Sequence, residues 1–436
     1  MDMLNEACRR RFVRLALSCC LAALLLCSLT ARAQTRAVLS LNEALALAER
    51  NAPALNAVMH GVQAAREMAV AAGQLPDPVL RAGVENLPVA GADRWNLTRD
   101  FMTMRRVGVM QEFVSTDKRE LLRRRAELDA VRQQASQSRL TSSLRQDVAN
   151  AWFERYYAGQ SRTLLNSLAK EVELQLRTLD AQIRAGKASA SDASMASAAL
   201  LQVEDRLLVT RRQEELARIT LQRWLGDDAL REPGALPDIE SLTLNPADAA
   251  VLASVPALRE HETESEIARA DLAVTQSNSS PNWSWELAYS LRGPGFPNMV
   301  SFGVSIPLTV RAADRQDREV AAKMAQLEQA HAQHEDMRRD TQAAMSGALA
   351  EWKSLLERRK RLATALLPVA RQRIDLTLAS YRAGPGSLAA VLEARRAEVE
   401  VRMQLLELER DRAKLWAQLQ YLYAGPAANR VQGALP

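Results

Sequence analysis

Only a few side chains in this sequence could bind a metal ion. His331 and His334 lie three residues apart in a predicted helix and could contact one ion together, but no third ligand lies near them, which favours ordinary solvated positions. Three methionines, whose soft thioethers suit Cu(I), share one face of a predicted strand, where methionine more commonly fills apolar space: Met102, Met104 and Met110. The sequence therefore predicts no metal site and no cofactor.

No arrangement of residues points to catalysis. The chain has no phosphate-binding loop, no nucleophile elbow and no paired metal-binding motif. All four cysteines lie within the first 33 residues, so the mature chain is expected to hold no thiol nucleophile and no disulfide: Cys8, Cys19, Cys20 and Cys27. We therefore expect a protein that is not an enzyme.

The first 33 residues have the pattern of a cleaved signal peptide. A basic stretch, CRRRFVR, precedes the apolar run Leu15–Leu29, and the small-x-small sequence ARA then places the mature start at Gln34. The apolar run is short for a membrane-spanning helix, which argues against a retained anchor. The segment carries five arginines and two acids, so its removal lowers the formal net charge from +5 to +2 and leaves no basic patch for nucleic acid.

The rest of the chain reads as two copies of one unit. Three pairs of segments match in the same order at offsets of 203, 195 and 198 residues, which is much stronger evidence than any single match. The matching pairs are Leu41–Arg66 with Leu244–Arg269, Val107–Phe113 with Phe302–Leu308, and the RAG sequences at Arg184 and Arg382. We therefore expect a signal peptide (1–33), a first repeat (34–242), a second repeat (243–425) and a C-terminal tail (426–436), with the repeats joined near Glu232–Pro246.

Each repeat is predicted to contain the same elements in the same order. A capped helix comes first, with Ser40 and Glu43 forming a capping box in the first copy and Asn245 preceding Pro246 in the second. Two short strands, one long helix, an Ala-Gly turn and a second long helix follow. The strands are expected near residues 77–88 and 103–114, and near 282–292 and 299–310.

The predicted strands have one apolar and one polar face. Strict alternation runs through WSWELAYSL and SFGVSIPLTV, and each strand is about as long as a tilted membrane-crossing strand. The apolar positions are Trp283, Trp285, Tyr289, Phe302, Val304, Ile306 and Leu308. A small sheet in a soluble domain is the alternative, but no other segment offers a face to cover these strands. In lipid, an open sheet edge cannot be satisfied and four strands are too few to close, so several chains would pool their strands.

Two long helical stretches lead to the glycine-containing turns. Thr116 to Ile183 contains no proline and would reach roughly 100 Å at about 1.5 Å per residue. The second copy spans Asp314 to Tyr381, with a kink expected at Pro368. Glycine is expected to end each stretch in a left-handed turn, followed by a serine that caps the returning helix: Gly186 with Ser189, and Gly384 with Ser387.

The segments LSLNEALALAERNAPAL and AAGQLPDPVL, the paired IRAG and YRAG tips and the duplication resemble the TolC family of outer-membrane efflux factors. The resemblance implies a mainly α fold with membrane β: two tandem repeats that form, as a homotrimer, an outer-membrane β-barrel with four strands per chain and a long periplasmic α-helical barrel. It implies an exit duct of a tripartite efflux system in the cell outer membrane. The partners would be outer-membrane lipid, a periplasmic adaptor (membrane fusion) protein and an inner-membrane RND-type pump.

The stretches GQLPDPVLRAGVENLP and MTMRRVGVMQEF are similar to the heavy-metal branch of that family, the CzcC-like and CusC-like members. Heavy-metal cations are therefore the expected cargo. Multidrug export and type I protein secretion are the alternatives within the family. A periplasmic coiled-coil adaptor or structural scaffold is the alternative from another class.

The resemblance also assigns roles to residues at the turns. Asp192 and Glu393 are candidate pore-gate acids that would favour cations in rings, although both can equally be ordinary solvated helix positions. The two tips are candidate adaptor contacts, while their arginines could also interact with the helix C-terminal dipoles: Arg184, Ala185, Gly186, Arg382, Ala383 and Gly384.

Overall fold

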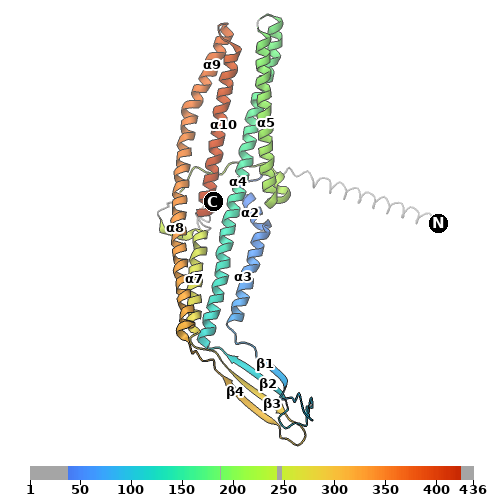
Figure 1. Ribbon diagram of the computed structural model, residues 1–436. Coiled ribbons are helices and arrows are strands. Elements are labelled where there is room, and N and C mark those ends of the chain that lie inside the picture. The colour runs from blue at the N-terminus through green and yellow to red at the C-terminus, as the bar shows by residue number, and fades with distance from the viewer. Residues whose placement is uncertain (1–37, 187, 243–247, 424–436) are drawn as a thin grey trace, which may run out of the picture. The chain divides into compact units, whose positions relative to one another are not determined.

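A computed structural model describes residues 38–186, 188–242 and 248–423 (Figure 1). The predicted signal peptide, the cap at Asn245 and Pro246 and the whole predicted C-terminal tail lie outside these residues. The chain forms two compact units, each of which takes segments from both sequence repeats. The hairpin unit comprises residues up to Asn51, Val148–Glu240 and Arg361–Arg410, and the sheet unit comprises Ala52–Asp147, Ser241–Lys360 and the residues from Asp411 onward.

The hairpin unit consists of helices and short connections. Its elements are α2 (Leu41–Asn51), the second part of α4 (Thr116–Arg184), α5 (Ala190–Leu225), the 3₁₀ turn η1 (Gly226–Leu230), the π-helical turn η3 (Leu362–Leu366), α9 (Leu367–Ala383) and most of α10 (Leu388–Gln418). Trp152, Phe153 and Leu165 are fully buried on the α4 side of its core. Farther along, Val203 of α5 and Val399 of α10 pack into one apolar cluster with Leu165.

The sheet unit combines helices with the four strands. Its elements are α3 (Pro53–Ala72), β1 (Val79–Glu85), β2 (Met104–Phe113), the first part of α4, α6 (Ala249–Ser254), α7 (Pro256–Ser277), β3 (Trp283–Leu291), β4 (Met299–Ser305), η2 (Ala312–Asp314), α8 (Gln316–Arg361) and the π-helical turn η4 (Leu419–Tyr423). Pro53 and Pro256 each lie in the first turn of their helix, where the missing N–H costs nothing. The two residues are 203 positions apart, as the repeat predicts.

The four strands form one antiparallel sheet in the order β1-β2-β3-β4 (Figure 1). The central pairing joins the two repeats, with Val107 of β2 opposite Tyr289 of β3. The close approach of these strands needs a glycine, because a Cβ on Gly108 would lie 2.7 Å from the Cβ of Ala288. The predicted fold class is therefore confirmed: mainly helical, with a small antiparallel sheet built from both copies.

The last strand is shorter than the alternation predicted. β4 ends at Ser305, so Ile306 and Leu308 lie beyond the strand and their assignment to it was wrong. Pro307 explains the difference, because proline has no N–H to donate to a ladder and restricts the residue before it. Met102 likewise lies outside β2, so only Met104 and Met110 share a strand face.

The second long helical stretch is interrupted next to Pro368, as predicted. The π-helical turn η3 separates α8 from α9, and Pro368 occupies the first turn of α9. A proline ring clashes with the carbonyl four residues earlier, here that of Thr364, and a π-helical turn at that place relieves the clash. Among the described residues, no helix is both long and apolar enough to cross a membrane.

Candidate functional site

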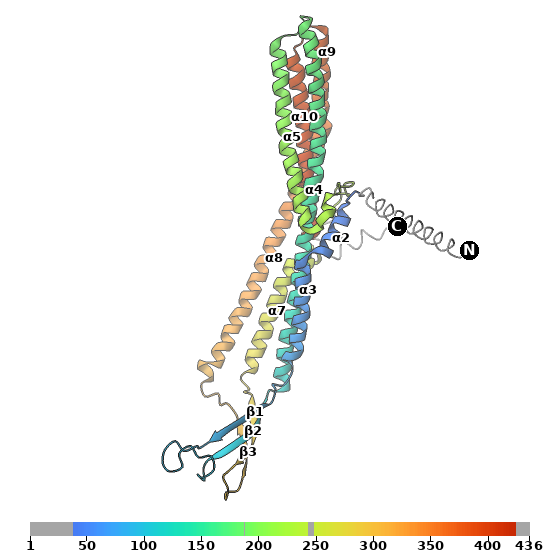
Figure 2. The ribbon, with the colours of Figure 1, turned by 90° about the vertical axis from the view of Figure 1, so that its right-hand side faces the viewer.

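The two glycine turns lie at the same end of the hairpin unit (Figure 2). α4 ends at Arg184 and Gly186 follows with φ 70°, while α9 ends at Ala383 and Gly384 follows with φ 102°. These positive φ values favour glycine, so the predicted left-handed turns are confirmed. All six predicted tip residues are exposed to solvent: Arg184, Ala185, Gly186, Arg382, Ala383 and Gly384.

A direct contact joins the α4–α5 hairpin to the α9–α10 hairpin next to their tips. The hydroxyl of Tyr381 donates a hydrogen bond to Oε1 of Gln182 at 3.0 Å. Beneath this bond, Leu179, Ala196 and Leu388 form a small buried cluster. Sequence reasoning missed the contact, although Tyr381 directly precedes the RAG sequence of the second tip.

Asp192, one candidate gate acid, closes a capping box at the start of α5. Its Oδ2 accepts hydrogen bonds from the backbone N–H of Ser189 at 2.9 Å and from the Ser189 hydroxyl at 2.7 Å. In return, the Asp192 N–H donates to Ser189 Oγ at 3.2 Å. The backbone bond first, and then the hydroxyl bond, lower the pKa of Asp192. Its carboxylate therefore has a local structural role, whatever it does in an assembly.

Glu393, the other candidate gate acid, is exposed and lines a groove of about 330 Å³ between α4, α5 and α10. The groove has an apolar floor that includes Leu165 and Val399, and Asp192 does not line it. An ion pair lies at the edge of this groove, where Arg395 of α10 is 3.7 Å from Glu171 of α4. The structure therefore places the two gate candidates in different surroundings.

At the first tip, Arg184 interacts with the end of its own helix. Its Nε donates to the carbonyl oxygen of Asp180 at 3.2 Å, as expected for a cation near a helix C-terminus. At the second tip, Ser387 caps α10, since its Oγ accepts a hydrogen bond from the Ala390 N–H at 3.2 Å. Both predicted serine caps are thus present.

One face of the sheet is apolar and exposed. Phe302 is 69% exposed, Leu287 49% and Tyr289 46%, although all are large apolar or aromatic side chains in regular strands. The predicted strand residues Trp283 and Val304 are exposed on the same face, and Trp285 is half-buried there. An exposed apolar area of this kind indicates a surface that another phase or molecule covers.

The opposite face of the sheet carries a chain of ion pairs. The Arg106 guanidinium contacts Glu85 of β1 at 2.8 Å and Glu286 of β3 at 3.0 Å. Glu286 also contacts Arg81 of β1 at 3.4 Å. These charges tie together three strands from both repeats, and the sheet is therefore apolar on one side and ionic on the other.

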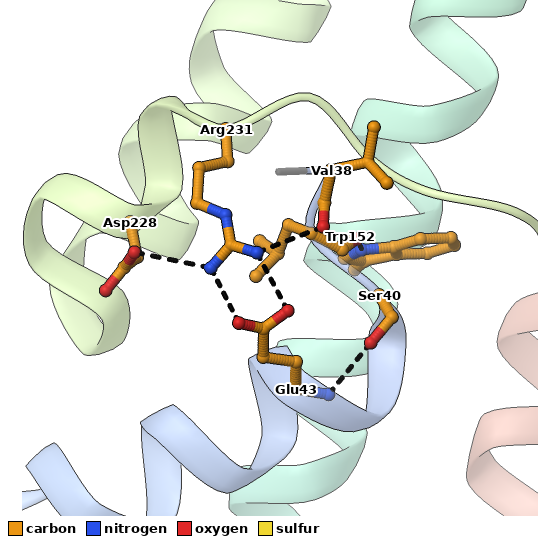
Figure 3. A network of polar contacts seen from close by, with 7 residues as sticks. Val38, Ser40, Glu43, Trp152, Asp228 and Arg231 are labelled. Atoms are coloured by element: carbon orange, nitrogen blue, oxygen red, sulfur yellow. Dashed lines mark hydrogen bonds and ion pairs between the residues drawn. The ribbon is translucent and has the colours of Figure 1, made fainter. Parts of the chain in front are cut away.

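A polar network holds the first described residues against the hairpin unit (Figure 3). Leu39 forms a parallel bridge with Pro233, and the indole N–H of Trp152 donates to the Leu39 carbonyl at 2.9 Å. Arg231 donates to both carboxylate oxygens of Glu43, at 2.7 and 2.8 Å, and to the Val38 carbonyl at 3.0 Å.

The same network includes the predicted cap of α2. The Glu43 N–H donates to Ser40 Oγ at 3.2 Å, which is one half of the predicted capping box, while the Glu43 carboxylate binds Arg231 instead of completing the box (Figure 3). The hydrogen bond from Arg231 is the main cause that lowers the pKa of Glu43, and the same bond raises the pKa of Arg231. Sequence reasoning could not find this pair, because the two residues lie in different parts of the repeat.

The histidines and methionines that the sequence offers as metal ligands do not gather into a metal-binding group in the part of the chain that the structure describes. In residues 38–186, 188–242 and 248–423, no group of three or more His, Cys, Asp and Glu side chains could hold a metal ion. His334 lines a pocket together with Arg259 and Arg338, and His331, three residues earlier in α8, does not line it. Met104 and Met110 lie on the ionic face of the sheet, opposite Glu85 and Val79 respectively.

Comparison with known proteins agrees with this architecture. Residues 249–425 match the family model described as outer membrane efflux protein. No curated protein sequence matches the chain significantly. Among solved structures, the chain is similar to CusC, with 17% identity and a TM-score of 0.72 over 88% of this chain and 92% of that one.

Two further structures share the fold at similar distances. A membrane protein from Pseudomonas aeruginosa has 19% identity and a TM-score of 0.76, over 88% of this chain and 90% of that one. The outer membrane protein VceC from Vibrio cholerae has 18% identity and a TM-score of 0.72, over 88% and 96%. Residues 249–425 thus match the outer membrane efflux protein family, and the chain shares the fold of these solved structures over most of its length.

Proposed function

We propose that this chain is the outer-membrane exit duct of a tripartite efflux system and that it works as a homotrimer. The observation that carries the proposal is the sheet with one exposed apolar face and one ion-paired face. Lipid would cover residues such as Phe302 and Leu287, and the charges around Arg106 would face a water-filled lumen.

The trimer follows from the edges of the sheet. β1 and β4 each pair on one side only within the described chain, and lipid cannot satisfy free backbone N–H and C=O groups. Four strands are too few for a barrel, since the smallest bacterial ones have eight. Three chains with four strands each would close a twelve-stranded barrel, with strand neighbours antiparallel throughout.

The helices would lie in the periplasm, to which the predicted signal peptide would direct the chain. The exposed tips around Gly186 and Gly384 would contact a periplasmic adaptor, and an inner-membrane RND-type pump would supply the energy. Asp192 and Glu393 would act near the tip constriction, Asp192 while it also caps α5.

For the cargo, we propose heavy-metal cations. The stretch GQLPDPVLRAGVENLP, which is similar to the heavy-metal branch of the family, supports this choice over drugs or secreted proteins. Deleting the gene and measuring tolerance to zinc, cobalt, cadmium, copper and antibiotics would test it. Sensitivity to antibiotics alone would contradict metal cations as the cargo but would remain consistent with the proposed exit duct.

Two substitutions on neighbouring residues of β4 test the duct itself. Phe302→Arg places a charge on the apolar face, which costs about 2–4 kcal/mol in the middle of a bilayer, whereas Ser301→Arg places it on the polar face. We expect the first variant to lose the heat-modifiable trimer in outer-membrane fractions and the second to keep it. Equal yields of trimer would argue for a periplasmic scaffold or adaptor.

A further inference from the structure

The loops at one end of the sheet are built and ordered by their own side chains. The β1–β2 loop (86–103) and the β3–β4 loop (292–298) leave the same end, since Glu85 pairs with Met104 and Ser290 with Met299. Within the first loop, Asn96 Oδ1 accepts from the Thr98 N–H at 2.9 Å and from the Arg99 N–H at 3.0 Å. Such side-chain turns fix a loop locally.

The two loops also lock onto each other. The Arg292 guanidinium donates to the carbonyl oxygen of Phe101 in the first loop and stacks over the Phe296 ring at 5.0 Å in its own loop. Gly293 lies so close to the first loop that a Cβ on it would be 1.7 Å from the Thr98 carbonyl oxygen. The loops and the first two residues of β2 therefore form one rim, defined as residues 86–105 and 292–298.

This rim holds large apolar side chains out in solvent. Val89 is 67% exposed, Trp95 60% and Phe101 57%. Trp95 keeps a left-handed backbone with φ 59°, which is rare for a bulky residue, and its N–H donates to the Pro88 carbonyl at 2.8 Å. Strain of this kind, held by surrounding bonds, is characteristic of residues with a task in binding.

The rim is also basic, with four arginines and two acids. The acids serve the loop itself: Asp100 Oδ1 accepts from the Met102 N–H at 2.7 Å, and Asp93 is 4.0 Å from Arg99. Three of the arginines are exposed: Arg94, Arg99 and Arg105. Arg105 stands on the apolar face of the sheet, opposite Val84 and Leu291, at the edge where that face meets the loops.

We propose that this rim docks the anionic phosphate headgroups of lipids in the membrane leaflet that surrounds it. The guanidinium fork of arginine matches phosphate, and tryptophan prefers the depth of the headgroups. A lipid is the occupant because the cations border a continuous apolar face, which a free anion would not use. This inference rests on the proposed function, since it requires the sheet to lie in a bilayer.

The test uses the full-length mature protein in phosphatidylcholine vesicles with or without dioleoylphosphatidic acid, whose headgroup is a phosphate monoester. Brominated acyl chains on either lipid quench tryptophan emission. The ratio of quenching by the two brominated lipids reports the preference of the protein for the anionic phosphate lipid, phosphatidic acid. We expect Arg94→Gln, Arg99→Gln and Arg105→Gln to reduce that preference by about fivefold for each arginine removed, and replacement by lysine to preserve most of it. Added salt should weaken the preference.

A matched control removes three exposed arginines that follow the opposite end of the sheet: Arg311→Gln, Arg315→Gln and Arg318→Gln. This control should keep the preference for the phosphate lipid. A rim variant that keeps the preference, a control variant that loses it, or competition by inorganic phosphate at constant ionic strength would each overturn the inference. If the protein inserts into vesicles but shows no preference for phosphatidic acid, only the headgroup-binding role of the rim is contradicted. If the protein does not insert into vesicles at all, the proposed function is contradicted as well.

Discussion

Two serines at equivalent tips cap their helices with different chemistry. Ser189 shares a reciprocal capping box with Asp192, whereas Ser387 bonds only to the N–H of Ala390, whose side chain offers no carboxylate in return. The caps therefore differ in their response to pH. The hydrogen bonds from Ser189 lower the pKa of Asp192, so the ionised carboxylate stabilises the fold. This stabilisation is fully present above the ordinary pKa of an aspartate and is lost as the pH falls through the lowered pKa.

We predict that Ser189→Ala and Ser387→Ala each weaken their cap by about 1 kcal/mol at neutral pH, roughly a fivefold faster local hydrogen exchange. As the pH falls through the lowered pKa of Asp192, the effect of Ser189→Ala should shrink, because protonation of the carboxyl then weakens the box in the native protein. The effect of Ser387→Ala should not change. Exchange of the Asp192 and Ala390 amides measures both, and equal pH dependence at the two tips would contradict the capping-box account.

The pair of Glu43 and Arg231 leads to a second residue-scale prediction. Glu43→Gln removes the charge that Arg231 binds, so the segment at Val38 and Leu39 should open more often (Figure 3). Hydrogen exchange of the Leu39 amide, which donates to the Glu232 carbonyl at 2.8 Å, should become faster. In the native protein the same exchange should accelerate as the pH falls toward the lowered pKa of Glu43.

The outcome for Glu43 needs a control that leaves the ion pair in place. Glu49→Gln changes another acid of α2 and should leave the Leu39 amide as protected as before. If the Glu43→Gln variant keeps its protection at Leu39, the bridge to Pro233 and the bond from Trp152 hold the segment without help from the ion pair.

At the scale of elements, replacing a glycine by alanine should have opposite effects on stability at a tip and inside a helix. Gly384 has φ 102°, so Gly384→Ala forces a strained backbone and should destabilise the hairpin unit by about 1–2 kcal/mol. Gly347 lies inside α8, is exposed and has open space around it, so Gly347→Ala should stabilise by up to about 1 kcal/mol. Denaturation of the two variants in detergent should therefore shift in opposite directions.

The elements also show what sequence reasoning can and cannot reach. The tip turns, the serine caps and the alternation through Trp283–Leu291 follow from local rules, and the structure agrees with them. The alternation predicted too long a β4, since the single proline at Pro307 overrides it. The internal repeat also indicated which element of one copy corresponds to which element of the other.

Contacts between distant segments could not be predicted in this way. Arg106 and Glu286 are 180 residues apart, and Tyr381 and Gln182 are 199 apart. The register between strands or helices decides which of many charged and polar side chains meet, and a shift by one residue would turn the strand partners to the other face. The ion pairs on the polar face of the sheet could therefore be identified only once the strand register was known.

At the scale of the whole molecule, the free edges of the sheet predict how copies would meet. β1 and β4 are different strands, so a closed ring of copies joins β1 of one to β4 of the next, and each contact is heterologous. Residues with even numbers point to the apolar face in both strands, as Ala82 does through its pairing with Val107, and Phe302 through Leu287. Partners across the contact should therefore both be even-numbered.

Cysteine substitutions can test this, because all native cysteines precede residue 34. We expect Ala82→Cys combined with a cysteine at one of the even β4 positions, Val300, Phe302 or Val304, to oxidise into covalent trimers, since side chains directly opposite on antiparallel strands have Cβ atoms about 5 Å apart. Each single-cysteine variant should stay monomeric on a denaturing gel, because a heterologous contact never brings a residue against its own copy. Ala82→Cys with Ser301→Cys, on opposite faces, should also fail. Dimers from a single cysteine would mean that like edges meet, and such a pairing cannot close a ring of three.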